Sequence, residues 1–562
     1  MVIYKWPIAA VKEGERIIRN FLWSGDPVKK KFLTIKWAKV CKHPSEGGIG
    51  IKCLKDINIA MLMKLGWAFL NDHEPWAKFL RAKFLNIEGL LTQYYKNSSI
   101  WTGLKEAIVT VKAHSKWIIG SGKDIDFWRD CWGSDSAIYD LLEIPDDIWK
   151  HCTAKLSQII HHNTWSAPPE VVELLGSLGI DLNGIILNSS DKDIWVWKYC
   201  PHGLFSVNSA FQHTSSHAPK VWWYPFTSSK VILPIIASFA WRICHNSLAT
   251  EDLLIMRGLH KISRCSLCRC NLENMQHLFW NCPRSTEIWD WIASLFQLQA
   301  GFTNLKTTLE SCKHLSSYLN DIWKAAVLNI VYLTWIARNV SVFEKFSHSI
   351  NDIKRRSLIA IKDAAGLSCN NMANNCLELL IVAALGVPIK ARPLPRIQST
   401  TWALPRFQEA KINCGAAAIG ATGKAGVGAA AGNHLGDVLG VLTKGLGNST
   451  LFFSECEAIL GAIDWAVQNN WKKIWIESDS QTAISEFTKN HVPWPQRARW
   501  NRMKTSFDQI RFSHCWKVAN FSAYQAAKRG VSLPVGNLET FLGRPHFLTK
   551  IEEPNVCYFR FN

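Results

Sequence analysis

The chain has 562 residues, with 64 Lys and Arg against 45 Asp and Glu, which gives a formal net charge of +19. A hydrophobic fraction of 48% excludes a wholly disordered chain, and the length allows roughly three to five folding units of ~100–200 residues. The excess of positive charge favours a polyanionic partner, either nucleic acid or an anionic membrane.

The N-terminal region is expected to be mostly helical and basic. Residues 1–130 carry 22 Lys and Arg against 12 Asp and Glu, with the densest cluster at Lys29, Lys30 and Lys31. These cations fit a solvated face and contacts with phosphates equally well, and Trp23, Trp37 and Trp67 would offer stacking surfaces in the second case.

Local patterns predict three structural elements and one linker between residues 57 and 408. Apolar residues recur at helical spacing over 57–70, which predicts a buried helix. Residues 117–132 predict a strand, a turn at 120–122 and a second strand. Another apolar helix is predicted over 325–338, and the proline-rich stretch 387–408 is typical of a linker.

Membrane insertion and secretion are both disfavoured by the sequence. The longest apolar run, 325–337, has 13 residues and ends at Arg338, whereas a spanning helix needs ~20. Residues 1–12 lack the hydrophobic core of a signal peptide. Seventeen cysteines in such a chain indicate reduced thiols and a metal site. We therefore expect an intracellular protein, cytoplasmic or nuclear, with no membrane partner.

Four metal-ligating residue types fall within 18 residues: Cys265, Cys268, His277 and Cys282. Zinc takes four such ligands tetrahedrally, with sulfur at ~2.3 Å and nitrogen at ~2.0–2.1 Å. Four protein ligands leave no position for a catalytic water, so the predicted zinc is structural and helps the domain fold. Cys270 is a competing ligand, and clustered free thiols beside a core histidine are the alternative.

The C-terminal third is expected to form a mixed sheet with helices packed on it. The predicted elements are a strand over 411–420, a hairpin over 426–442, a helix over 454–468, a strand over 472–477 and a helix over 480–488. In the first of these helices Ser454 is the predicted N-cap, with Glu457 as the capping-box residue. Glu455 shares the inward face with Ile459.

These motifs, taken in order, resemble those of a known family. The stretch 205–210, Trp241-Arg242 and the cysteine–histidine cluster resemble the zinc-binding domain that follows plant LINE-type (non-LTR) reverse transcriptases. Further matching stretches are 20–25, 46–51, 127–130, 335–339 and 343–344. The C-terminal third resembles a type 1 ribonuclease H domain. We do not expect a reverse transcriptase, because no Asp-Asp pair lies in a hydrophobic hairpin as in a polymerase palm, and the pair Asp146-Asp147 is expected to lie in a proline-flanked loop.

The resemblance implies a multidomain α+β chain. Its parts are a post-polymerase connecting region (1–194), a reverse-transcriptase-type zinc-binding domain (195–295), a helical connector (296–386), the linker (387–408), an α/β ribonuclease H-like domain (409–535) and a tail (536–562). The first two parts are expected to be mostly helical, and the ribonuclease H-like part to be a mixed sheet with flanking helices.

In a ribonuclease H, four carboxylates hold two Mg²⁺ ions that act in phosphodiester cleavage. By resemblance, Glu455 and Asp479 fill two of these positions, although Asp479 is also suited to cap the following helix. The first-strand aspartate is lost near Cys414, where the motif reads one residue short and the strand's facing is expected to slip. Tyr524 stands in place of the fourth. A thiol and a phenol do not replace carboxylates on Mg²⁺.

Three hypotheses follow for the function. The first is a retroelement-derived nucleic-acid-binding protein with a structural zinc site and a degenerate ribonuclease H-like domain. The second is an active RNA–DNA hybrid ribonuclease, which would need Mg²⁺ and stand-in acids such as Glu409 or Asp437. The third is a non-catalytic scaffold or relic. A charge of 14 Lys and Arg against 8 Asp and Glu over 411–530 favours nucleic acid, bound with little sequence specificity. The sequence does not specify the oligomeric state.

Overall fold

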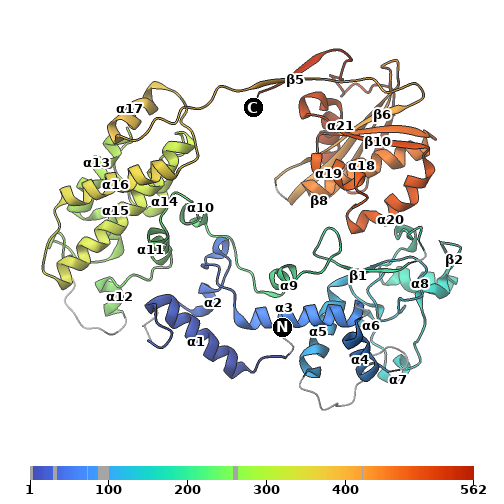
Figure 1. Ribbon diagram of the computed structural model, residues 1–562, viewed down its shortest axis with the longest axis horizontal. Coiled ribbons are helices and arrows are strands. Elements are labelled where there is room, and N and C mark those ends of the chain that lie inside the picture. Colours follow the sequence, from blue (N-terminus) through green and yellow to red (C-terminus); the bar gives the residue numbers. More distant parts are fainter. Residues whose placement is uncertain are drawn as a thin grey trace. The chain divides into compact units, whose positions relative to one another are not determined.

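The computed structural model describes residues 4–29, 35–71, 74–86, 91, 100–190, 192–256, 258, 264–420 and 422–561. Lys30 and Lys31, two members of the basic cluster predicted at the N-terminus, lie outside the described residues. The chain divides into two compact units. The first comprises Met1–Trp6, Asp56–Ser215 and Pro395–Asn562, and the second comprises Pro7–Lys55 and Ser216–Leu394 (Figure 1).

The second unit is helical. Its helices are α1 (Ile8–Ser24), α2 (Trp37–Val40), α10 (Tyr224–Thr227), α11 (Pro234–Cys244), α12 (Glu251–Ile255), α13 (Pro283–Leu295), α14 (Leu305–Glu310), α15 (Ser317–Phe343), α16 (Ile350–Leu367) and α17 (Cys376–Leu385). The predicted apolar helix is the middle of α15, which packs against α11, α13, α14 and α16 and buries Trp323 and Val327 completely. The hydrophobic core of this unit is therefore built around α15.

By length and composition alone, α15 is the one helix among the described residues that would reach across a membrane. Half of its most apolar 18-residue window is buried within the structure, as in the core helix of a globular unit.

The N-terminal part of the first unit is also mostly helical. Its helices are α3 (Leu54–Asn71), α4 (Pro75–Phe84), α5 (Trp101–Ala113), α6 (Ile138–Leu141), α7 (Asp146–Trp149), α8 (Pro169–Ser177) and α9 (Val207–Thr214). The helix predicted over 57–70 is α3. The loop predicted for Asp146-Asp147 is wrong, because this pair begins the short helix α7. The ring of Trp67 stacks on Phe205 with the centroids 5.4 Å apart, so this indole is engaged inside the unit.

The hairpin predicted over 117–132 is wrong. β1 (Ser115–Ile118) pairs antiparallel with β4 (Ile194–Trp197), about 80 residues further along the chain, and 125–132 form turns packed into a core. The buried carboxylate of Asp193 accepts hydrogen bonds from the backbone N–H groups of Gly120 and Gly122, at 2.7 and 3.0 Å. Asp193, which directly precedes β4, therefore fixes the glycine turn after β1. Because this contact is distant in sequence, the local pattern did not identify β4 as the partner of β1.

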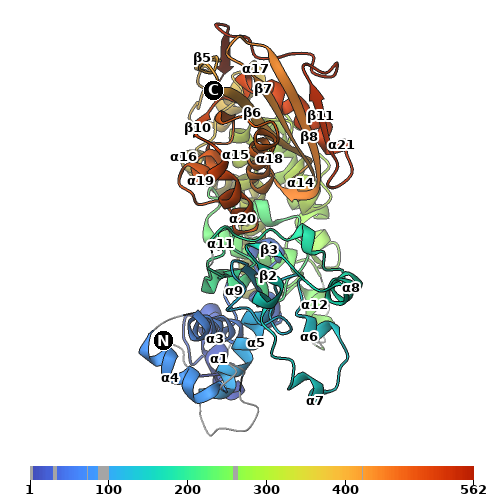
Figure 2. The ribbon, with the colours of Figure 1, turned by 90° about the vertical axis from the view of Figure 1, so that its right-hand side faces the viewer.

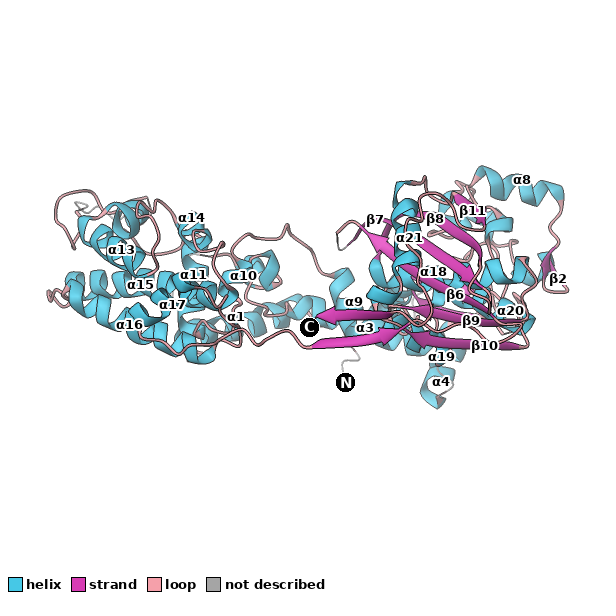
Figure 3. Cartoon of the chain, turned by 90° about the horizontal axis from the view of Figure 1, so that it is seen from above, coloured by secondary structure: helices cyan, strands magenta, loops and turns pink. Residues whose placement is uncertain are grey.

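The C-terminal part of the first unit is built on a six-stranded mixed sheet (Figure 3). The strands are β6 (Ala410–Ala418), β7 (Thr422–Gly432), β8 (Val438–Thr450), β9 (Lys473–Ser478), β10 (Gln509–His514) and β11 (Leu538–Leu542), in the order β10-β9-β6-β7-β8-β11. β6, β7, β8 and β11 run antiparallel, whereas β9 is parallel to β6 and β10 is parallel to β9. The predicted fold class, with a helical N-terminal region and a ribonuclease H-like sheet, is confirmed.

Helices cover both faces of this sheet. Ile412, Cys414 and Ala416 of β6 belong to the core formed with α18 (Leu451–Gln468). On the other face, a Cβ atom at Gly428 of β7 would lie 2.2 Å from the backbone of α21 (Phe521–Ser532). Only glycine permits this approach, so α21 lies directly on the strands. The remaining helices are α19 (Gln481–Thr488) and α20 (Trp494–Met503) (Figure 2).

Two segments predicted as linker and tail contribute structure to the first unit. β5 (Ile397–Thr401), in the linker, pairs antiparallel with β12 (Cys557–Phe561), in the tail, and β11 of the tail forms one edge of the six-stranded sheet. The indole of Trp402 donates a 3.0 Å hydrogen bond to Asn413 of β6. The sheet therefore extends beyond the predicted C-terminal boundary at residue 535.

Candidate functional site

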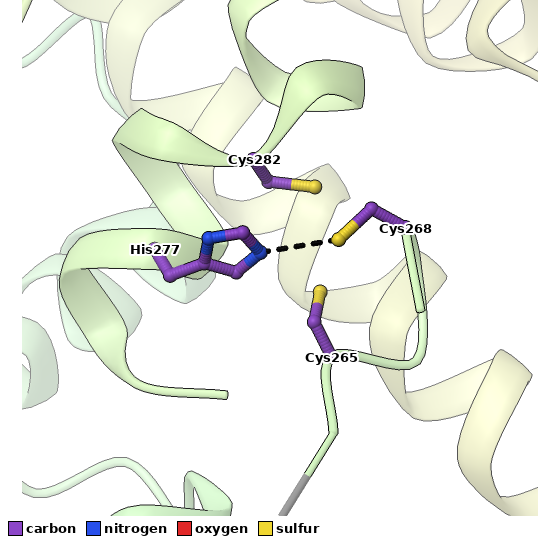
Figure 4. A group of neighbouring side chains, drawn as sticks. All are labelled: Cys265, Cys268, His277 and Cys282. Carbon is purple, nitrogen blue, oxygen red and sulfur yellow. Dashed lines mark hydrogen bonds between the residues drawn. The ribbon is translucent and has the colours of Figure 1, made fainter. Parts of the chain in front are cut away.

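The structure brings together the four residues of the predicted zinc site. The ligating atoms of Cys265, Cys268, His277 and Cys282 all lie within 4.8 Å of one another, with His277 Nε2 3.2 Å from Cys268 Sγ (Figure 4). Zinc ligands lie ~2.0–2.3 Å from the ion, so four of them must converge within a few ångströms. Three thiols and one imidazole with this spacing form a donor set that fits zinc.

Local hydrogen bonds position each ligand. The Cys265 N–H donates to the Asn271 carbonyl, and the Arg269 N–H donates to the Cys265 carbonyl, so 265–271 close a tight turn that presents two thiols. His277 begins the π-helical turn η4 (His277–Asn281), and its N–H donates to the Asn274 side chain at 2.7 Å. Cys282 is the N-cap residue of α13.

The environment of Cys282 favours its thiolate form. A hydrogen bond from the Cys265 thiol is the largest cause that lowers the Cys282 pKa. Burial opposes it, and the N–H groups of Arg284 and Ser285 at the start of α13 lower the pKa further. The thiolate is the form that binds a metal, so this end of α13 prepares one ligand.

Cys270, the competing ligand considered from the sequence, lies outside the cluster. It is exposed, and its thiol donates to the backbone carbonyl of Cys268 at 3.1 Å. It is therefore a suitable control residue for the metal site.

We expect the full chain to bind about one equivalent of zinc. Cys282→Ser should lose most of that zinc because it removes a buried thiolate ligand, whereas Cys270→Ser should retain it. Metal analysis of the purified proteins measures both. Equal zinc content in the two variants would contradict the four-residue site.

A buried ion pair connects the segment that carries the cysteine–histidine cluster to α15. The guanidinium of Arg338 donates to Glu273 in three hydrogen bonds of 2.5 to 3.1 Å, and the Glu273 side chain is completely buried. Arg338 belongs to the 335–339 motif, whose role the sequence did not reveal, and Glu273 lies four residues before His277. The pair fixes the segment between the two halves of the metal site.

Removing the cation of this pair should destabilise the second unit. Arg338→Met leaves Glu273 buried without its cation, which typically costs about 3–5 kcal/mol. Arg355→Met is the control, since the Arg355–Asp352 pair is 71% and 42% exposed and such pairs are worth ~0–1 kcal/mol. Urea denaturation gives both values, and the double variant Arg338→Met/Glu273→Met should recover most of the loss. Equal effects at Arg338 and Arg355 would contradict this assignment.

A second candidate site lies where β6, β9, α18 and α21 meet. Glu455 is on α18 and is 7% exposed, and its pKa is raised to about 8 by burial first and by the charge of Asp479 second. One oxygen of Glu455 is buried without a hydrogen-bond partner. Asp479 follows β9 and accepts a 2.9 Å hydrogen bond from the Asn520 amide. The structure therefore places the two predicted carboxylates close enough to repel each other.

The helix-capping predictions around these residues are wrong. Thr450 is the N-cap of α18 and its hydroxyl accepts from Phe453 N–H, so the helix begins before Ser454. Glu457 has no capping role and instead binds Arg499 at 2.7 Å and Lys444 at 3.0 Å. Ser480 caps α19, which leaves Asp479 free of the capping role considered for it.

Gly415 occupies the position on β6 that faces Asp479. A Cβ atom there would lie 3.3 Å from Asp479 Oδ1 and 3.4 Å from Asn520 Nδ2. The pairing of β6 with β7 runs from Lys411 to Ala418 with no register shift within β6, so the expected slip does not occur. Cys414 faces the opposite side, in the core beneath α18. Gly415, directly after Cys414, is thus the position on β6 where a side chain would meet Asp479.

Tyr524, in the first turn of α21, lies between two lysines. The Lys517 ammonium is 3.9 Å and the Lys528 ammonium 4.6 Å from its ring centroid. Distances of this size are typical of cation–π contacts. The position expected to hold the fourth carboxylate therefore carries an aromatic ring with associated positive charge.

The acids suggested as stand-ins have other partners. Glu409 is paired with Arg511 at 2.7 Å, and Asp437 accepts from the Asn433 amide in the turn between β7 and β8. Glu477 of β9, also buried, is paired with Lys411 at 2.7 Å. Two carboxylates and a flanking ammonium do not fit a pair of Mg²⁺ ions, which needs several oxygen ligands.

Comparisons with known proteins match two segments of the chain. Residues 205–289 match the family described as zinc-binding in reverse transcriptase, and residues 413–530 match the family described as reverse transcriptase-like. The first segment contains all four ligands of the cysteine–histidine cluster, and the second contains Gly415, Glu455, Asp479 and Tyr524.

One curated relative and several solved structures are also similar. A protein of Arabidopsis thaliana named "Putative ribonuclease H protein" is 23% identical over 560 residues, covering 94% of this chain and 86% of its own length. Ribonuclease H1 of Halobacterium salinarum is 20% identical, with 22% of this chain and 97% of that chain covered and a TM-score of 0.21. LC11-RNase H1, solved with an RNA/DNA hybrid, is 16% identical with a TM-score of 0.20, over 22% of this chain and 96% of that one. In chain order, a segment similar to the zinc-binding family of reverse transcriptases is thus followed by a segment similar to the reverse transcriptase-like family.

Proposed function

We propose that this is a retroelement-derived nucleic-acid-binding protein whose ribonuclease H-like domain binds nucleic acid without cleaving it. The observation that carries the proposal is the site around Glu455 and Asp479. Two of its positions hold Gly415 and Tyr524 in place of carboxylates, and Lys517 contributes positive charge there. Loss of metal ligands removes the two-ion chemistry, while lysines near the site support binding to phosphates.

The charge distribution supports nucleic acid as the partner. Residues 1–130 and 411–530 contribute +10 and +6 of the net +19. The +6 of residues 411–530 belongs to the first unit, which contains the ribonuclease H-like sheet. Most of the N-terminal excess belongs to the second unit, because residues 7–55 carry 11 Lys and Arg against 4 Asp and Glu. The zinc site would then have a structural role in the second unit. All 17 cysteines are free thiols, in keeping with a location inside the cell.

Binding and cleavage of a labelled RNA–DNA hybrid by the full chain test this proposal. We expect binding that weakens steeply with salt, because bound lysines and arginines release counterions from the phosphates. No Mg²⁺-dependent cleavage above that of the Glu455→Gln variant is expected. Failure to bind hybrid, duplex and single strand at low salt would refute the proposal and favour the scaffold hypothesis.

An active hybrid ribonuclease is the second candidate. The unpartnered buried oxygen of Glu455 favours it, since a cation would satisfy that oxygen. Mg²⁺-dependent cleavage that Glu455→Gln abolishes would establish this function and overturn the first proposal.

A further inference from the structure

Two exposed lysines flank the ring of Tyr524 beside the carboxylate pair. Lys517 begins the short helix η6 (Lys517–Ala519), and Lys528 lies one turn beyond Tyr524 on α21. Both ammonium groups contact the ring, at 3.9 and 4.6 Å from its centroid. Within the part of the chain that the structure describes, no carboxylate pairs with either lysine. Their charges are therefore available to a ligand.

Hydrogen bonds fix the start of α21, which carries Tyr524. Asn520 links the carboxylate site to α21. Its side-chain amide donates to Asp479 Oδ1 and to the Cys414 backbone carbonyl. Its backbone carbonyl accepts from the Tyr524 N–H at 3.2 Å. The first turn of α21 is also fixed by the buried Glu552, which accepts from Ser522 N–H at 2.8 Å. The ring of Tyr524 thus has a defined position, and both ammonium groups are aligned on it.

The charge of Lys517 also reaches the carboxylates. It is one of the groups that lower the Glu455 pKa, against the larger effects of burial and Asp479. An ammonium group therefore lies at the edge of the site where, by resemblance, a ribonuclease H would use metal ions to contact a phosphate. A lysine supplies a fixed positive charge and hydrogen-bond donors without any metal.

We propose that Lys517 and Lys528, aligned on Tyr524, bind a backbone phosphate of nucleic acid at this position, so that binding needs no divalent metal. The inference rests on the proposed nucleic-acid function and adds the group that is recognised and the residues that recognise it. A phosphodiester is the chemistry that fits, because two lysine ammonium groups offer donors and charge but no reading of base edges. Such a site is expected to hold the nucleic acid in a stable complex without cleaving it.

The test measures hybrid binding by the full chain in EDTA, over a range of salt concentrations. We expect the wild type to bind without metal, and Lys517→Gln/Lys528→Gln to bind at least about 10-fold more weakly, because two charged hydrogen bonds are lost. Each phosphate contact removed should reduce the salt slope by about 1. Lys473→Gln/Lys489→Gln, which removes the same charge at two other exposed lysines, should change affinity much less.

The ring is tested separately. Tyr524→Phe keeps an aromatic face and should bind like the wild type, whereas Tyr524→Leu removes the cation–π contacts and should bind several-fold more weakly. Equal affinity and salt slope in Lys517→Gln/Lys528→Gln and the wild type would overturn the inference while leaving the proposed function intact. Binding that requires Mg²⁺ would also overturn it. Absence of all nucleic-acid binding would remove both proposals.

Discussion

The double variant Gly415→Asp/Tyr524→Asp is expected to acquire metal-dependent cleavage of an RNA–DNA hybrid. A Cβ atom at Gly415 would point at Asp479, 3.3 Å from its Oδ1 atom, and Tyr524 occupies the first turn of the adjacent helix α21. With Glu455 and Asp479 already present, the variant would have four carboxylates around one point. Oxygen ligands in that number suit Mg²⁺ or Mn²⁺, and two such ions are what phosphodiester cleavage requires.

The expected gain is at least about 10²-fold in cleavage rate over the wild type, since correctly placed charge stabilisation at a single position is commonly worth 10²–10³. Without metal the variant should be less stable than the wild type, because an aspartate at position 415 adds a like charge in tight contact with Asp479. Adding Mg²⁺ should restore the melting temperature. Hybrid cleavage and thermal unfolding, each with and without Mg²⁺, measure the two effects.

Two further variants make this prediction specific. Gly415→Asn/Tyr524→Asn has side chains of the same size without charge and should remain inactive with or without Mg²⁺. Adding Glu455→Gln to the aspartate variant should abolish the acquired activity. Cleavage by the asparagine variant would show that the carboxylates are not responsible.

Much of the fold could be predicted because its signals are local. The helix over 57–70, the strands around 411–420 and 472–477 and the hairpin between β7 and β8 all have clear periodicity or turn residues within one element. The cysteine–histidine cluster was equally accessible, since all four residues lie within 18 positions and ligand type and spacing are visible in the sequence.

The remaining errors come from partners that are distant in sequence. Asp193 fixes the turn at 120–122 from about 70 residues away, and Arg338 holds Glu273 from 65 residues away. Neither contact leaves a local pattern. At the carboxylate site, the spacing of the motif suggested a shortened strand, whereas β6 keeps a regular register and places Gly415, the residue after Cys414, against Asp479.

Capping was mispredicted for a related reason. Ser454 and Glu457 have capping-box spacing, but Leu451, Phe452 and Phe453 are also compatible with a helix, and Thr450 precedes them. The true role of Glu457 depends on Arg499 of α20, which is 42 residues further along the chain. A local motif of this kind predicts a helix start only when no equivalent cap lies one turn earlier.

Glu455→Gln is expected to stabilise the metal-free protein, and by more at alkaline pH. The Glu455 pKa is raised from 4.5 to about 8 because the carboxylate is buried and faces Asp479. A raised pKa in an acid means that the folded state binds its proton more tightly than the unfolded state does. The wild type therefore loses stability as the pH rises from about 4.5 to about 8, whereas glutamine does not titrate.

The size of the effect follows from that pKa. At about 1.4 kcal/mol for each tenfold change in proton affinity, the stability advantage of the Glu455→Gln variant over the wild type approaches about 5 kcal/mol above pH 8, where Glu455 is ionised, and vanishes near pH 4.5. Urea denaturation of the wild type and the Glu455→Gln variant at several pH values measures this difference in stability. If Glu455 binds a cation, Mg²⁺ should stabilise the wild type and cancel the advantage of glutamine. A stability advantage of Glu455→Gln that is independent of pH would show that Glu455 is not held in the protonated form. A stability advantage that persists unchanged in Mg²⁺ would agree with a site that has lost its metal ions.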